Sequence, residues 1–333
     1  MMRTLQNPVL VLIGSLLFLI AVIIITPLIG SQSLDYRQVL QFIEGQQTPD
    51  GTIFFQIRMP RILLAVLTGA SLALAGVVFQ ALLRNPLATP YTLGVSSGGA
   101  LGALLIIKTG LSFTLLGFSS VQAAAFTGSV LTILLVYFLS RRVGKISIHI
   151  MILAGVTISY FFAALNLILH YLSDFTETHQ MIRWMMGGLD IIGYNALLRS
   201  LPVLLISFVG LWLMSRTYNI LSTSEETALS KGVNVARVQK ISFVLASLIT
   251  GTVVALSGPI GFVGLIVPHL LRMLGGPDHR YLIPSSIFFG GGFLALADTF
   301  ARTIISPIDL PVGILTALLG GPFFLWLLFK QKF

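Results

Sequence analysis

Three arginines stand where the sequence changes from polar to apolar, and their guanidinium groups could bind carboxylates. Arg58 and Arg61 flank Met59-Pro60 before a long apolar run, and Arg302 ends another apolar run in LADTFARTII. A guanidinium group binds a carboxylate through two parallel hydrogen bonds. These side chains could form an exposed basic rim that docks an acidic soluble partner. Alternatively, they anchor helix ends at the lipid headgroups.

The polar stretch 221–240, LSTSEETALSKGVNVARVQK, could present a short helix to another protein. The run TSEE at 223–226 has the pattern of a capping box, a hydroxyl residue followed by Glu three positions later. Lys231 and Gly232 fit the last turn and a left-handed cap, and Asn234 fits the cap of the next helix. We expect a helix of about two turns, too short to span a bilayer. It is either a docking element or a solvated connection.

Aromatic and polar side chains share the apolar stretch 149–172. They are Tyr160, Phe161, Phe162, Asn166 and His170. This mixture suits the wall of a pathway for a large, partly apolar ligand. Haem ligation could use His170, His179 or the methionines at 181, 185 and 186, although methionines at such spacing usually serve packing.

The sequence lacks the motifs of three common kinds of site. It contains no cysteine, no G-x-x-x-x-G-K-[ST] and no H-E-x-x-H. These patterns would supply a thiolate, a phosphate cradle and a zinc site, respectively. We therefore expect a chain that is not an enzyme and that binds no cofactor or metal of its own.

The elements that must position these residues are membrane-spanning helices. The chain has 333 residues, of which 56% are hydrophobic and 9% charged, whereas soluble domains carry about 25% charged residues. Although the net charge is +9, the basic residues are scattered, so a nucleic-acid partner is not expected. We predict an all-α polytopic membrane protein of one domain. Its ten spans cover approximately 9–29, 60–82, 92–108, 119–139, 149–172, 195–215, 238–257, 260–275, 281–299 and 309–329.

The distribution of Lys and Arg predicts the orientation of these spans. With the N-terminus inside, thirteen of the 20 basic residues fall in inner segments, as the positive-inside rule requires. Both termini and the stretch 221–240 are then cytoplasmic. The inner segment that begins Arg84-Asn85-Pro86-Leu87 has two prolines and several glycines. Irregular backbone at membrane depth is either a pathway wall or close helix packing.

Taken together, these motifs resemble those of the iron-chelate and cobalamin permeases, the FecCD/BtuC type of ABC importer. The resemblance covers nearly the whole chain. It is carried by RMPR at 58–61, LLRNPLATPYTLGVSSGGA at 82–100, WMMGG at 184–188, EETALSKGVNV at 225–235, GPIGFVGLIVPHLLR at 258–272, GPDHR at 276–280, LADTFAR at 296–302 and LPVGILTALLGGPFF at 310–324.

The resemblance implies a subunit of the cell's inner (plasma) membrane with several partners. It would pair with a second copy of itself, with two ATPase subunits that use ATP and Mg²⁺, and with a soluble substrate-binding protein. Transport would proceed by alternating access. A ferric siderophore is the first expectation for the substrate; cobalamin and haem are the alternatives.

The resemblance also assigns roles to positions of this chain. Arg58, Arg61 and Arg302 match the positions that meet the binding protein. The ATPase-coupling positions are Thr223, Ser224, Glu225, Glu226, Ala228, Gly232 and Val233. The inner gate would use Asn85, Leu87, Ile148 and His149, and the pathway-lining candidates are Tyr160, Phe161, Asn166 and His170.

Two other classes of function are weighed against this interpretation. A secondary transporter driven by an ion gradient would need carboxylates at the middle of the membrane, which the spans do not offer. A membrane-embedded enzyme would need a convergent nucleophile, base and carboxylate, and no such set is evident.

Overall fold

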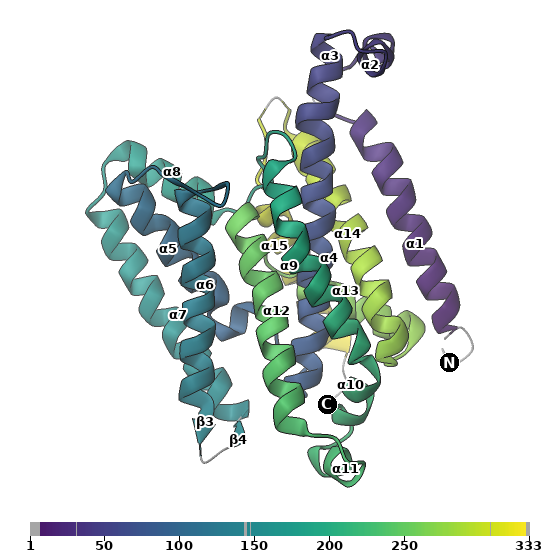
Figure 1. Cartoon of the computed structure of the whole chain (residues 1–333), viewed down its shortest axis with the longest axis vertical. Helices are drawn as coiled ribbons and strands as arrows, with labels where there is room; N and C mark the ends of the chain where they lie inside the picture. Colours follow the sequence, from purple (N-terminus) through teal and green to yellow (C-terminus); the bar gives the residue numbers. More distant parts are fainter. Residues whose placement is uncertain (1–6, 31, 143–144, 147, 307, 331–333) are drawn as a thin grey trace.

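The structure is a computed structural model that describes residues 7–30, 32–142, 145–146, 148–306 and 308–330. Almost all of this part is helical (Figure 1), which confirms the predicted all-α class. The only strands within it form two short antiparallel hairpins, β1 (Thr114–Leu115) with β2 (Phe118–Ser119) and β3 (Arg141–Arg142) with β4 (Lys145–Ile146). The predicted location of the two termini concerns residues 1–6 and 331–333, which lie outside the described residues.

Seven helical segments are long and apolar enough to cross a membrane, as judged over the described residues. They contain α1 (Pro8–Ile25), α4 (Met59–Leu83), α6 (Ser120–Ser140), α7 (Ile148–Tyr171), α9 (Asn195–Leu213), α12 (Val235–Ser257) and α14 (His279–Ile304). Three further helices are apolar but too short to be counted among these spans: α5 (Val95–Thr109), α13 (Val263–Gly275) and α15 (Val312–Lys330). Helix α15 was judged over residues 312–327 only. Each of the ten predicted spans therefore has a helix, while the count of ten crossings stays a prediction.

The predicted spans 92–108 and 260–275 begin too early. Residues 91–93 form the 3-10 turn η3 (Tyr91–Leu93), after which Gly94 has φ +81°. The stretch before α13 is irregular, and Phe262 has φ +67°. The Ile260 amide donates to the Tyr91 hydroxyl at 2.7 Å. In a regular helix the backbone amides are bonded within the helix. In this irregular stretch a side chain from elsewhere in the fold accepts the hydrogen bond instead.

Two polar stretches between the predicted spans, at 30–57 and 173–194, also contain helices. Residues 30–57 contain α2 (Tyr36–Ile43), α3 (Pro49–Thr52) and a π-type turn, η2 (Ile53–Arg58). The latter two continue into α4 and give a helix of 35 residues. The gap 173–194 contains α8 (Phe175–Met185), which has a true capping box between Asp174 and Glu177. Lys108 donates to Glu177 at 2.8 Å and so lowers the pKa of the Glu177 carboxyl.

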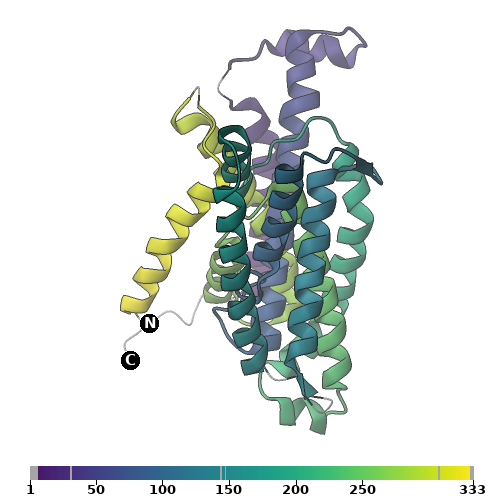
Figure 2. The same cartoon turned by 90° about the vertical axis from the view of Figure 1, so that its left-hand side faces the viewer.

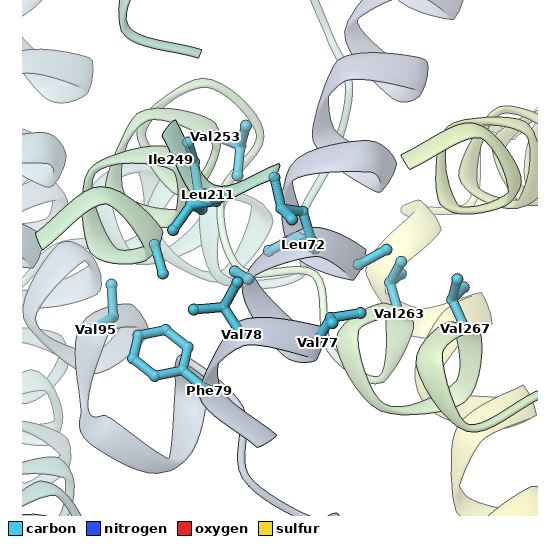
Figure 3. Close-up of a cluster of buried hydrophobic side chains, with 14 of the residues drawn as sticks. Leu72, Val77, Val78, Phe79, Val95, Leu211, Ile249, Val253, Val263 and Val267 are labelled. Carbon is cyan, nitrogen blue, oxygen red and sulfur yellow. The ribbon is translucent and has the colours of Figure 1, made fainter. Parts of the chain in front are cut away.

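Helix α4 is the centre of the bundle, and α12, α13 and α14 pack against it. A Cβ atom added at Gly69 would lie 2.1 Å from the Gly290 carbonyl oxygen, and one at Gly76 would lie 2.0 Å from that of Gly264. Glycine at these positions allows the helix backbones to approach closely. Figure 3 shows the apolar core around this axis, where Val77 lies beside Val263 of α13 and Phe79 lies beside Val95 of α5.

The predicted outer and inner segments gather at opposite ends of the molecule (Figure 1). Helices α2, α3 and α8 lie at one end, and the β3–β4 hairpin lies at the other. The latter end also holds the two short helices α10 (Ser215–Leu221) and α11 (Glu225–Ser230). The terms outer and inner end refer to these two ends below.

Candidate functional site

The three outer arginines are buried, which makes their predicted exposure wrong. Arg58, Arg61 and Arg302 expose 6%, 9% and 7% of their surfaces. Arg58 lies against the chain before α2, where it donates to the Pro27 carbonyl oxygen at 3.0 Å. A buried arginine at a membrane boundary needs partners within the protein. For two of these arginines, the fold supplies such partners as acidic side chains.

Asp298 is the shared partner of two of these arginines. It is 1% exposed and accepts hydrogen bonds from Arg61 Nε at 3.0 Å and from Arg302 Nε at 3.1 Å. Arg61 Nη1 also lies 3.2 Å from Asp190 and 3.3 Å from Asp309, both half exposed. We call these five residues the outer ionic cluster. It joins α4 and α14 to the segments that precede α9 and α15.

A cleft of about 390 Å³ lies beside the outer ionic cluster. Its lining mixes charged with apolar groups: Arg61, His179, Ile182, Arg183, Met186, Gly188, Asp190, Ile308, Asp309, Leu310 and Pro311. Arg183 pairs with Asp190 at 3.2 Å. The sequence interpretation missed this cleft because its walls come from α8 and from the segment before α15, which are far apart in the chain.

Helix α11 is the expected short helix of the stretch 221–240, with one error at its start. The cap is Ser224, whose hydroxyl accepts from the Thr227 amide at 2.9 Å, and not Thr223. A capping box with Glu226 is therefore absent here, because position 227 is the third residue of the helix. Gly232 has φ +75° after the helix, and Asn234 caps α12, as predicted.

The proposed coupling positions divide into exposed and internal ones. Glu226 and Gly232 are exposed, while Ala228 is fully buried and Val233 is half-buried. The side of α11 that carries Ala228 therefore packs against the bundle, and the side that carries Glu226 is open to solvent. Glu225 forms an ion pair of 3.7 Å with Arg84 at the end of α4. This pair connects the stretch 221–240 to the central helix.

The side chains of α10 form a polar cluster with the start of α14. Asn219 bonds to Asp278 and His279, and the Tyr218 hydroxyl lies 2.6 Å from Ser242 Oγ. Burial raises the pKa of Tyr218. Arg280 and then Asn219 hold the pKa of the Asp278 carboxyl well below its usual range. Sequence reasoning did not single out Asn219, since no local pattern marks it.

The predicted inner gate residues lie on the turn after α4 and at the start of α7. Asn85 Oδ1 accepts from the Leu87 amide at 2.9 Å, the local turn that Asn favours. Leu87 and His149 are exposed. Ile148 is the first residue of α7, and its side chain lies outside the described residues.

The pathway candidates on α7 do not share one face. Tyr160 and Phe161 are exposed, His170 is half-buried, and Asn166 is buried with an Oδ1 atom that accepts no hydrogen bond from the described residues. An α-helix turns about 100° per residue, so Asn166 lies on the other side from Phe161. The pathway role of these four residues stays a prediction. No group of three or more His, Asp or Glu that could hold a metal occurs among the described residues.

Comparisons with known proteins give one consistent answer. A family model described as the FecCD transport family matches residues 17–330. The hemin transport permease HmuU of Yersinia pestis is 39% identical and covers 96% of both chains. The cobalamin import permease BtuC of Halobacterium salinarum is 40% identical and covers 89% of this chain and 78% of its own. A solved structure, described as the inward-facing conformation of a candidate metal-chelate ABC transporter, is 35% identical. It has a TM-score of 0.84 and covers 98% of this chain and 100% of its own.

Proposed function

Since the chain belongs to the FecCD transport family and is a multi-pass ABC transporter permease, we propose that it imports a metal chelate. It would do so in the plasma membrane, as one of two identical permease subunits above two ATPase subunits. A soluble binding protein would deliver the chelate to the outer end. The observation that carries the proposal is α11, a capped helix at the inner end that is joined to the central helix through Arg84 and Glu225.

Each end of the molecule supports one step of this function. An ATPase that engages α11 would act on α4 through the Arg84–Glu225 ion pair and through α10, which packs against both helices. Closure of an ATPase dimer would then reach the spanning helices. Arg183 is an exposed cation at the outer end, and Arg61 lines the same cleft. A carboxylate of an incoming binding protein would compete with Asp190 and Asp309 for these arginines. Exchange of ion-pair partners would couple docking to the outer ionic cluster.

The substrate we propose first is a ferric siderophore, with haem as the second candidate. The exposed aromatic side chains of α7, Tyr160 and Phe161, suit the apolar periphery of either ligand. Haem is retained because the hemin permease of Yersinia pestis resembles this chain over almost its full length. ATP and Mg²⁺ belong to the partner ATPase in this proposal, and this chain holds no cofactor of its own.

Uptake into proteoliposomes tests the proposal. The vesicles would hold the permease with its ATPase, with the binding protein outside and ATP inside, and would receive a ferric siderophore, haem or cobalamin in parallel. We expect ATP-dependent accumulation of one of them. Accumulation that continues without the ATPase would overturn the proposed importer.

A further inference from the structure

The side chain of Asn219 joins α10 to the N-terminus of α14. Its Nδ2 atom donates to Asp278 Oδ1 at 2.7 Å. Its Oδ1 atom accepts from the His279 amide at 2.8 Å, and His279 Nδ1 lies 2.8 Å from the same oxygen. An amide oxygen only accepts, so the imidazole donates through Nδ1. One side chain thereby connects the two helices through both of its polar atoms.

The contact with His279 serves as a helix cap that comes from another element. The first amides of a helix have no partner within it. Asp278 satisfies the Arg280 amide at 3.0 Å, and Asn219 satisfies that of His279. The start of α14 is thus closed by one residue of its own segment and one residue of α10. Any displacement of α10 acts directly on the backbone of α14.

Helices α10 and α11 are joined by a short connection that is bonded back to α10. Only three residues connect them, and the amides of Ser222 and Thr223 bond back to Tyr218 and Ile220 at 2.9 and 3.2 Å. Ala228 of α11 is fully buried. A force on α11 is therefore transmitted to Asn219 without a flexible connection between them.

The far end of α14 carries the outer ionic cluster. Helix α14 has 26 residues, which corresponds to about 39 Å at 1.5 Å per residue. Asp298, near its other end, binds Arg61 and Arg302, and Arg61 lines the outer cleft. One helix thus connects the inner contact at Asn219 to the outer cleft.

We propose that Asn219 is a positioning residue through which displacement of α10–α11 moves α14 and, with it, the outer ionic cluster. The inference rests on the proposed function, because it takes α11 as the element that the ATPase engages. Asn219 touches neither the substrate nor the outer cleft in this scheme. Its role is to make movement at the inner end reach the outer end.

The substitution Asn219→Asp tests this role at constant side-chain size. It replaces the donor to Asp278 by a second carboxylate, while an oxygen still faces His279. A hydrogen bond to a charged group is lost and like charges meet. We expect substrate taken up per ATP hydrolysed to fall about tenfold. The ATPase should copurify with the variant as it does with the parent chain.

Two further variants separate coupling from folding. Asn195→Asp makes the same change of atoms at an exposed residue in the first turn of α9, and the uptake ratio should not change. The double variant Asn219→Asp/Asp278→Asn exchanges the amide and the carboxylate. The amide of residue 278 can then donate to the carboxylate of residue 219. It should recover most of the lost uptake. A double variant as impaired as the single one, or loss of the ATPase from the complex, would overturn the inference.

A second readout does not depend on the choice of substrate. The native chain contains no cysteine, so Ile308→Cys carries one fluorophore at an exposed position of the outer cleft. ATP should change the emission in this background, and Asn219→Asp should abolish that change. An equal response in both would overturn the inference. A response to ATP without uptake of any tested chelate would count only against the proposed substrates.

Discussion

At the scale of single residues, the outer arginines are buried and bind other groups of the same chain. Asp298 is almost fully buried and serves two guanidinium groups, whereas Asp190 and Asp309 are half exposed and share Arg61. Removing one partner of a buried ion pair leaves the other charge uncompensated, which costs far more than losing an exposed pair. The three carboxylates should therefore differ sharply in their effect on stability.

Asp298→Asn should lower the stability of the permease strongly. The change leaves Arg61 and Arg302 without their buried counter-charge, which costs about 3–5 kcal/mol. Asp309→Asn is the matched control and should cost at most about 1 kcal/mol because its carboxylate is half exposed. The measurement is the thermal unfolding midpoint of each purified variant in the same detergent. Equal midpoints for both variants would mean that Asp298 is not the buried counter-ion.

Sequence reasoning predicted residues whose partners are local and missed those whose partners are distant. The caps at Gly232 and Asn234 depend on a few neighbouring residues, so their pattern is readable. Arg61 meets Asp298 across 237 positions, and neither residue indicates the other. Exposure was misjudged for the same reason: an arginine near a helix end is buried only if the fold brings an acid to it.

At the scale of elements, the glycines of α4 determine how closely its neighbours approach. Gly76 faces the backbone of α13 at Gly264, and Gly69 faces that of α14 at Gly290. These contacts involve carbonyl oxygens, which cannot move aside as a flexible side chain can. Hydropathy predicted the existence of these helices, whereas the short lengths of α5 and α13 depend on tertiary contacts that it does not register.

Gly76→Ala should therefore loosen the α4–α13 contact. Its Cβ would lie 2.0 Å from the Gly264 oxygen, and overpacking of this kind costs about 1–3 kcal/mol. The control is Gly14→Ala in α1, where an added Cβ meets nothing within 4 Å and alanine is the better helix former. Thermal unfolding in detergent should show a lower midpoint for Gly76→Ala alone. A midpoint unchanged from the parent would show that the two helices can separate without cost.

At the scale of the whole molecule, α7 and α15 each have a face that the described residues leave uncovered. Helix α15 diverges from the bundle (Figure 2), and Leu318 is 63% exposed on it. Helix α7 exposes Tyr160, Leu167 and Tyr171. Lipid could cover purely aliphatic faces, but tyrosines along a spanning helix favour a protein partner or an aqueous pathway. Both helices suit the proposed contact with a second copy.

Cross-linking in the cysteine-free chain checks this arrangement. Phe161→Cys on α7 should give a covalent dimer with a flexible bismaleimide, because α7 faces the second copy in the proposed assembly. Leu17→Cys is the control, since it is similarly exposed on α1 at the opposite side of the bundle (Figure 1). The measurement is the band of doubled mass on a denaturing gel. Dimers from the α1 variant alone would place the interface on the other side.

The shared carboxylate of Asp298 also has an evolutionary consequence. A lineage that loses this acid leaves two buried cations behind, so neutral drift at position 298 is blocked unless an arginine changes as well. Positions 61, 298 and 302 therefore form one heritable unit. Asp190 and Asp309 can be replaced one at a time, because the remaining carboxylate still pairs with Arg61. Divergence among relatives of this chain should accordingly be concentrated at the rim of the outer cleft, while the buried carboxylate and its two arginines persist or disappear together.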